Sequence, residues 1–126
     1  MSVSYSIEDH ILIITAVGHY DITDLVRTFD AALTHPQFEP GLQLLLDWRQ
    51  AVALPRVAEL PSRWANLASV KSLFSSQVAF VASQPADLER ARLFAIYVRP
   101  QGFIVEIFTD QDAARRWLLS NQTAES

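Results

Sequence analysis

The feature that most constrains the fold is a short apolar run at residues 42–47, Leu-Gln-Leu-Leu-Leu-Asp, which follows Gly41. A brief apolar run bounded by turn signals is typical of a strand that is buried on both faces. Such strands occur mainly in parallel sheets that are covered by helices. The run therefore predicts the central strand of an α/β domain, with Asp47 at its carboxyl end.

Two earlier strand patterns predict a hairpin. Residues 3–7 alternate apolar and polar side chains, whereas residues 11–17 are β-branched and almost continuously apolar. The polar residues 8–10 separate the two patterns, and Gly18 follows the second. We therefore expect an opening antiparallel pair whose first strand is half-buried and whose second strand is covered on both faces.

Downstream, helix patterns alternate with strand patterns. Asp21 can cap a helix to about Thr34, because its carboxylate can accept from the N–H groups of the first turn, and His35-Pro36 then stops that helix. The other expected elements are an irregular loop at 48–55, a helix from about Arg56, a strand at 77–82, a helix introduced by Pro85 and Asp87, a strand at 103–108 and a helix capped by Asp110. The order β-β-α-β-α-β-α-β-α predicts a mostly parallel five-stranded sheet with an opening antiparallel hairpin and four main helices.

The length and composition indicate one soluble domain. The 126 residues suffice for a single domain, expected at 1–120, with a polar tail at 121–126. The absence of cysteine excludes disulfides, thiolate nucleophiles and cysteine-ligated metal centres. The N-terminus lacks the pattern of a signal peptide, and no apolar run approaches the roughly 20 residues of a membrane span. We therefore expect a cytoplasmic protein without a membrane span.

Charge and motif patterns exclude several kinds of partner. The net charge is −4 and the basic residues are scattered, whereas nucleic-acid binding requires a basic stripe. The three glycines are isolated from one another, so the sequence has no glycine-rich phosphate loop. His10, His19 and His35 do not share a metal-ligand spacing. The sequence therefore predicts no nucleic-acid partner, no metal and no cofactor.

Several stretches together resemble a known family. They are residues 44–49 (Leu-Leu-Leu-Asp-Trp-Arg), residues 77–81 (Gln-Val-Ala-Phe-Val), residues 108–110 (Phe-Thr-Asp) with positions 113, 114, 117 and 118, the helix end at 35–38, and Gly41. In this pattern the chain resembles the bacterial SpoIIAA-like group, which is related to STAS (anti-anti-sigma-factor) domains and more distantly to CRAL-TRIO lipid-binding domains. The resemblance covers nearly the whole chain. It implies a SpoIIAA/STAS-like fold and a role in protein interaction or regulation.

One departure from that family concerns its regulatory serine. In the phospho-switched members, an Asp-Ser-Ser-Gly-like turn after the central strand supplies this serine. Residues 51–57 of this chain read Ala-Val-Ala-Leu-Pro-Arg-Val and contain no hydroxyl side chain. Since a regulatory phosphate needs such a hydroxyl, the sequence argues against a phosphorylation-switched antagonist of an anti-sigma kinase.

Polar residues gather where two expected parallel strands end. Asp47, Trp48 and Arg49 end the central strand, and Ser83 and Gln84 follow the next one. Ligands of open parallel sheets bind at this edge. Asp47 and Arg49 can form a charge-assisted pair beside the flat wall of Trp48, with Ser83 and Gln84 as polar companions of a pocket. Alternatively, Asp47 accepts hydrogen bonds from the backbone of its own loop and only orders that loop.

His19 is a further candidate, because it lies in the loop that joins a buried strand to the start of a helix. The alternative is a surface histidine with no role in binding. No nucleophile with a base and an orienting acid can be assembled from residue spacing, so an enzyme is not supported.

Three functions remain open at this point. The first is a non-catalytic module that binds a protein partner or a second copy of itself through the apolar run 51–54 and a helix bearing Arg56, Glu59, Arg63 and Trp64. The second is a binder of a small apolar or lipid-like ligand, for which the three tryptophans and seven phenylalanines either line a pocket or form the core. The third and weakest is a small hydrolase that uses Asp47 or His19.

Overall fold

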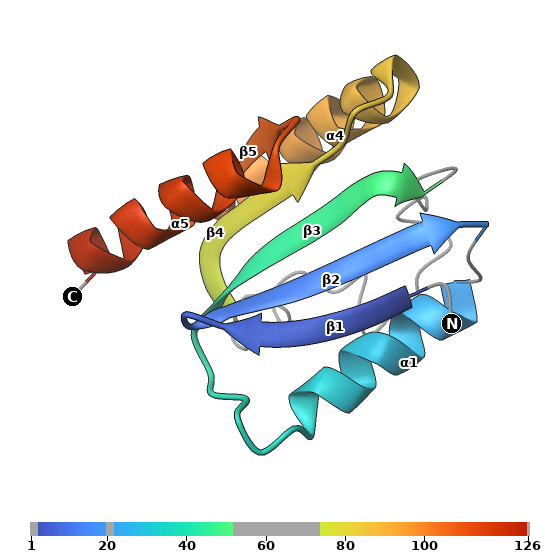
Figure 1. Ribbon diagram of the computed structural model, residues 1–126. Coiled ribbons are helices and arrows are strands. Elements are labelled where there is room, and N and C mark those ends of the chain that lie inside the picture. The colour runs from blue at the N-terminus through green and yellow to red at the C-terminus, as the bar shows by residue number, and fades with distance from the viewer. Residues whose placement is uncertain (1–2, 20–21, 52–73, 126) are drawn as a thin grey trace.

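Five strands form one sheet in the computed structural model, which describes residues 3–19, 22–51 and 74–125 (Figure 1). Their order across the sheet is β1-β2-β3-β4-β5. β1 is antiparallel to β2, and every later pair of neighbours is parallel. The strands are β1 (Val3–Glu8), β2 (Ile11–Gly18), β3 (Leu42–Ala51), β4 (Phe74–Val81) and β5 (Ile104–Phe108). The predicted mostly parallel sheet with an opening antiparallel hairpin is confirmed.

The helices of the described residues are α1 (Ile22–Leu33), α4 (Pro85–Val98) and α5 (Gln111–Glu125), with a short 3₁₀ helix η2 (Arg99–Gln101) after α4. The predicted cap Asp21 and the helix predicted from Arg56 lie outside the described residues. α5 continues to Glu125, so the segment that the sequence predicts as a polar tail is helical up to that residue. None of the helices in the described part of the chain is long and apolar enough to cross a membrane.

The helices cover the sheet from two sides (Figure 1). α1 and α4 lie on one face and α5 on the other, because their buried side chains belong to two separate clusters. Connections between parallel strands are nearly always right-handed. When successive strands are added in one direction across the sheet, the connecting helices therefore lie on the same face. α5 follows the last strand and is free of that constraint. The first cluster includes Leu12, Ile14, Leu25, Leu44, Leu46 and Ala91, and the second includes Ile11, Ile13, Leu45, Val81 and Leu118.

β3 is buried on both faces, as its apolar run predicts. Leu44 and Leu46 point into the first cluster and Leu45 into the second. The strand continues to Ala51, however, so the prediction of an irregular loop from Trp48 is wrong for residues 48–51. These residues remain in the sheet because β2 runs alongside them and pairs with Gln50 and Ala51. Backbone pairing of this kind leaves no periodic signal in the side chains.

The β1–β2 hairpin closes through Asp9 and His10, whose φ angles are 54° and 65°. Two consecutive residues with positive φ form the turn whose twist matches that of the flanking strands. Arg115 of α5 donates a hydrogen bond to the carboxylate of Glu8 at the end of β1. The hairpin end is therefore connected to the helix on the second face.

A buried amide ties β3 and β4 to α5. The Gln43 Nε2 group donates to Gln77 Oε1 and to the backbone carbonyl of Leu118, both at 2.7 Å. Gln43 and Gln77 are buried, so neither water nor a flexible surface group takes over these bonds. A buried polar group that loses its partner carries the full cost of its desolvation.

We therefore expect Gln43→Leu to lower the free energy of unfolding by about 2 kcal/mol, because it leaves two buried acceptors without that donor. Urea denaturation followed by circular dichroism measures the change. Gln50→Leu on the same strand is the matched control, since Gln50 is exposed and surface substitutions change stability by at most about 0.5 kcal/mol. Equal effects of the two substitutions would contradict a supporting role of the amide.

Candidate functional site

Asp47 lies in the second half of β3, opposite Val81 at the end of β4 and directly before a β-bulge. Ala16 of β2 lies opposite two residues of β3, Trp48 and Arg49, because the register shifts between the flanking pairs. A bulge bends its strand and changes the direction of its side chains. Here it shifts the alternation of β3 by one position, so that Ala51 is buried. The two residues after Asp47 are thus held in the sheet, close to the carboxylate.

Asp47 and Arg49 form a bidentate ion pair at this edge. Arg49 Nε donates to Asp47 Oδ1 at 3.0 Å, and Arg49 Nη2 donates to Asp47 Oδ2 at 2.8 Å. The backbone N–H of Arg49 also donates to Oδ1, at 3.2 Å. The Asp47 side chain is only 6% exposed, whereas that of Arg49 is 37% exposed. The charge-assisted pair and the local backbone bond, which the sequence offered as alternatives, therefore occur together.

A third donor reaches Asp47 from the start of α5. Gln111 Nε2 donates to Asp47 Oδ2 at 3.1 Å, across 64 residues of sequence. Gln111 is placed there by Asp110, whose carboxylate accepts from the backbone N–H groups of Asp112 at 3.3 Å and Ala113 at 3.2 Å. These bonds satisfy first-turn donors of the helix, which confirms the predicted cap. The Asp47 carboxylate thus joins the second half of β3 to the beginning of α5.

The electrostatics of this edge are dominated by carboxylates. The hydrogen bond from Arg49 to Asp47 raises the pKa of Arg49 above its ordinary value, and partial burial opposes that rise. The charges of Asp47, Asp110 and Asp112 raise the pKa of Arg49 further. Arg49 is therefore charged at any physiological pH and is outnumbered by three nearby carboxylates.

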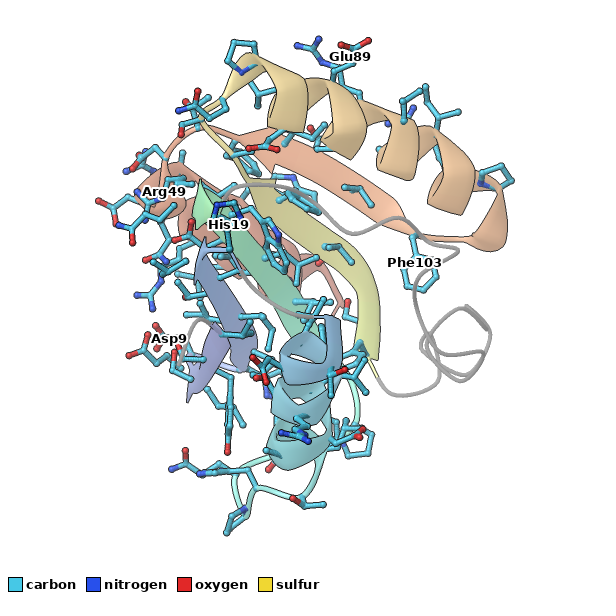
Figure 2. The ribbon with its side chains drawn as sticks, turned by 90° about the vertical axis from the view of Figure 1, so that its right-hand side faces the viewer. Asp9, His19, Arg49, Glu89 and Phe103 are labelled. Carbon is cyan, nitrogen blue, oxygen red and sulfur yellow. The ribbon has the colours of Figure 1, made fainter. Side chains whose placement is uncertain are left out.

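The other predicted site residues are placed at the same end of the sheet but differ in their contacts. The Ser83 hydroxyl donates to the backbone carbonyl of Arg49 at 3.4 Å. Gln84 precedes α4, where its backbone carbonyl accepts from Leu88 N–H at 3.0 Å and its side chain makes no capping bond. His19 is exposed and follows β2 (Figure 2). Asp47 therefore makes hydrogen bonds with Arg49 and Gln111, and Ser83 is connected to this cluster through the backbone carbonyl of Arg49.

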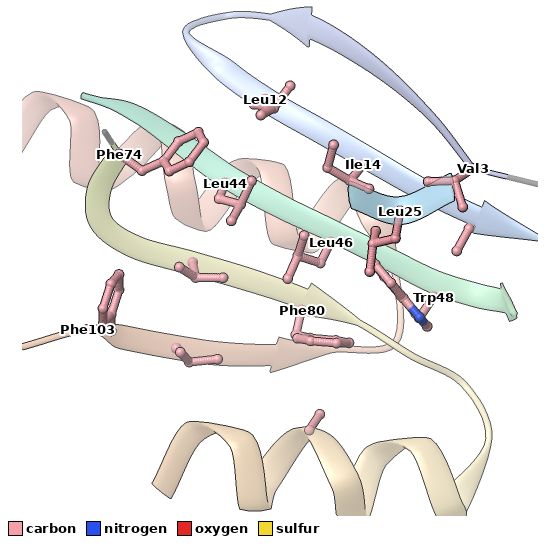
Figure 3. Packing of buried hydrophobic residues seen from close by; sticks show 14 of the residues in the cluster. Val3, Leu12, Ile14, Leu25, Leu44, Leu46, Trp48, Phe74, Phe80 and Phe103 are labelled. Carbon is pink, nitrogen blue, oxygen red and sulfur yellow. The ribbon is translucent and has the colours of Figure 1, made fainter. Parts of the chain in front are cut away.

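Trp48 does not line this edge, contrary to its predicted role as a wall beside Asp47. Its side chain is 2% exposed and belongs to the first cluster (Figure 3). The ring centroid lies 5.7 Å from that of Phe80. Alternation along β3 accounts for this placement, because neighbouring side chains point to opposite faces of a sheet. The predicted binding residues Arg56 and Trp64 lie outside the described residues.

Sequence reasoning missed Gln111 and the buried pair Gln43–Gln77. Gln111 follows a cap residue in a segment that reads as an ordinary helix start, so only the fold brings it to Asp47. Gln43 did carry a signal, because it is a lone amide inside an apolar run. Among the described residues, no three His, Asp or Glu side chains are grouped so that they could hold a metal ion.

The sheet order, the single antiparallel hairpin and the helices on both faces define a SpoIIAA-like fold. A crystal structure of an uncharacterized protein of the DUF3478 family from Shewanella loihica PV-4, which has a SpoIIAA-like fold, is similar to this chain. The similarity covers 92% of this chain and 91% of that chain, with a TM-score of 0.61 and 17% sequence identity. It shows the fold, as the sequence resemblance predicted. No protein-family model matches the chain, and no curated protein matches it.

Proposed function

We propose that the chain is a non-catalytic protein-interaction module and that it binds its partner through the outward side of α4. The observation that carries this proposal is the direction of the side chains on that helix. Ala91 and Ala95 are buried against the sheet, whereas Leu93 is 62% exposed and Ile96 is 64% exposed. Residues three apart lie on the same side of a helix, so Leu93 and Ile96 are neighbours.

Two large apolar residues that are exposed side by side are unusual on a surface helix. Helices of monomeric proteins usually direct their large apolar residues toward the core and their polar residues toward water. Scattered exposed apolar residues are common, but a contiguous exposed pair such as Leu93 and Ile96 favours an interface. Glu89, which lies one turn before Leu93, points away from the sheet in the same region (Figure 2). We call Glu89, Leu93 and Ile96, together with Arg99 that caps the C-terminal end of α4, the outer face of α4.

The bonds of Asp47 support a structural role for the predicted site. A general base or nucleophile must direct a free lone pair toward its substrate. Both carboxylate oxygens of Asp47 already accept hydrogen bonds, from Arg49 and from Gln111. The cluster therefore favours a clamp that holds the strand end to α5 over the hydrolase that the sequence left open.

The placement of aromatic side chains favours the same conclusion over an apolar ligand. Trp48 packs on Phe80, Phe38 on Phe74 and Phe108 on Trp117, with ring centroids between 5.7 and 5.9 Å apart. These rings contribute to the packing of the domain itself. A cytoplasmic location, consistent with the absence of cysteine, forms part of the proposal.

Site-specific photo-crosslinking in cells tests this function. A photoreactive amino acid replaces Arg92, which is exposed one turn before Ile96, and in a matched chain it replaces the exposed Arg116 of α5. We expect a discrete protein adduct from position 92 that disappears when Leu93→Asp is added, and no such adduct from position 116. Equal labelling from both positions, or none from position 92, would argue against an interaction through α4.

A further inference from the structure

We propose that the partner bound by α4 is a second copy of this chain, through antiparallel pairing of the two α4 helices about a twofold axis. This inference rests on the proposed function, because it names the partner of the same surface. Its basis is the order of four exposed residues, Glu89, Leu93, Ile96 and Arg99, which is acidic, apolar, apolar and basic, with the exposed Arg92 flanking the apolar pair.

The spacing of these residues is self-complementary. In a twofold interface between antiparallel helices, each residue before the axis on one copy contacts a residue after the axis on the other copy. The two residues lie the same number of positions from the axis. The midpoint between Leu93 and Ile96 falls at position 94.5, and the midpoint between Glu89 and Arg99 falls at position 94. At 1.5 Å of rise per residue, these midpoints differ by about 0.75 Å along the helix. A single twofold axis therefore places Leu93 of one copy against Ile96 of the other, and Glu89 of one copy against Arg99 of the other.

Charge favours this antiparallel orientation over a parallel one. Glu89 lies in the N-terminal half of α4, and Arg99 follows its C-terminal end. A parallel pairing would place each charge beside its own kind, whereas the antiparallel pairing places opposite charges together at both ends of the apolar centre. The helix dipoles also oppose one another in this orientation. Arg92 lies one turn before Ile96, where its aliphatic stem can cover the edge of the apolar pair.

The predicted dimer is weak and exchanges rapidly. A single pair of short helices buries less than the roughly 1,000 Å² of total surface that is typical of stable complexes. Association is therefore expected at protein concentrations between about 10 μM and about 1 mM. Added salt is expected to weaken it, because the charges of the outer face are exposed.

Sedimentation equilibrium over this concentration range provides the test. We expect a monomer–dimer equilibrium whose Kd rises about tenfold or more in Leu93→Asp, since a charge then lies at the centre of the interface. Glu89→Arg and Arg99→Glu are each expected to raise Kd several-fold, whereas the double variant Glu89→Arg/Arg99→Glu returns it to the original value. That rescue separates a specific Glu89–Arg99 contact from general stickiness.

Three outcomes would overturn the inference. One is a monomer at about 1 mM, a concentration that reveals even weak association. Another is a dimer whose Kd is the same in Leu93→Asp. The third is a melting temperature that falls by more than about 3 °C in Leu93→Asp, since Leu93 would then be covered within the monomer. A strict monomer that still gives a Leu93-dependent adduct with another protein removes the self-pairing but leaves the proposed function standing.

Discussion

Replacing Trp48 by alanine is expected to lower the free energy of unfolding by about 3–5 kcal/mol, the usual cost of removing a buried aromatic side chain. Trp48 is 2% exposed and packs in the first cluster with Phe80, so its removal leaves a cavity that the surrounding β-sheet cannot close. Urea denaturation followed by far-ultraviolet circular dichroism measures the loss. A domain of this size has a total stability of about 5–15 kcal/mol, so the variant is expected to be close to unfolding at 37 °C.

Trp48→Phe is the control, because it retains an aromatic ring and is expected to cost about 2 kcal/mol or less. The comparison distinguishes a core residue from a binding residue. If Trp48 instead lined a ligand site, Trp48→Ala would leave the unfolding transition almost unchanged and would weaken binding. That outcome would contradict the packing assigned to it.

Asp47→Ala is expected to lower the free energy of unfolding by about 2–3 kcal/mol. The substitution removes the acceptor of the Arg49 guanidinium and of the Gln111 amide, and it breaks the side-chain link between β3 and α5 at Asp47. We do not expect the larger losses of stability that follow when a fully buried ion pair is broken. The Arg49 side chain is more than a third exposed, so water screens its charge. Thermal and urea unfolding of Asp47→Ala measure the effect.

The double variant Asp47→Leu/Arg49→Leu is the companion experiment. When both partners of an ion pair become apolar, no charge is left without a partner, and such replacements are often nearly neutral. We therefore expect the double variant to be more stable than Asp47→Ala. The single variants Asp47→Leu and Arg49→Leu complete the comparison. If the loss of unfolding free energy in the double variant equals the sum of the losses in the two single variants, the residues act independently, which would contradict the clamp.

The sequence predicted those elements whose burial pattern repeats along the chain. β3 has seven consecutive buried residues from Leu42 to Trp48, and a short apolar run of this kind is typical of a strand inside a covered sheet. The Asp110 cap was equally visible, since its role depends only on the next three residues. The length of β3 beyond Asp47 could not be predicted, because it depends on backbone pairing with β2.

The candidate site was predicted less completely, for reasons of topology. The Asp47–Arg49 pair is local in sequence, so its two members were found together. Ser83 reaches the same edge only because β4 ends there, and Gln111 reaches it only because α5 begins there. The orientation of α4 was also hidden, because a segment containing Ala91, Leu93, Ala95 and Ile96 offers two apolar sides. Ala91 and Ala95 are buried in the structure, where α4 packs against β5.

One measurement tests the separate roles of α4 and of the Asp47 cluster most directly. It is the yield of the position-92 photo-adduct in the Asp47→Leu/Arg49→Leu double variant, compared with the chain that retains Asp47 and Arg49. We predict the same adduct at undiminished yield, because the cluster holds the sheet edge to α5 and does not bind the partner. Loss of the adduct from a double variant that keeps its circular dichroism spectrum and melting temperature would contradict this division of roles and would return the binding site to Asp47.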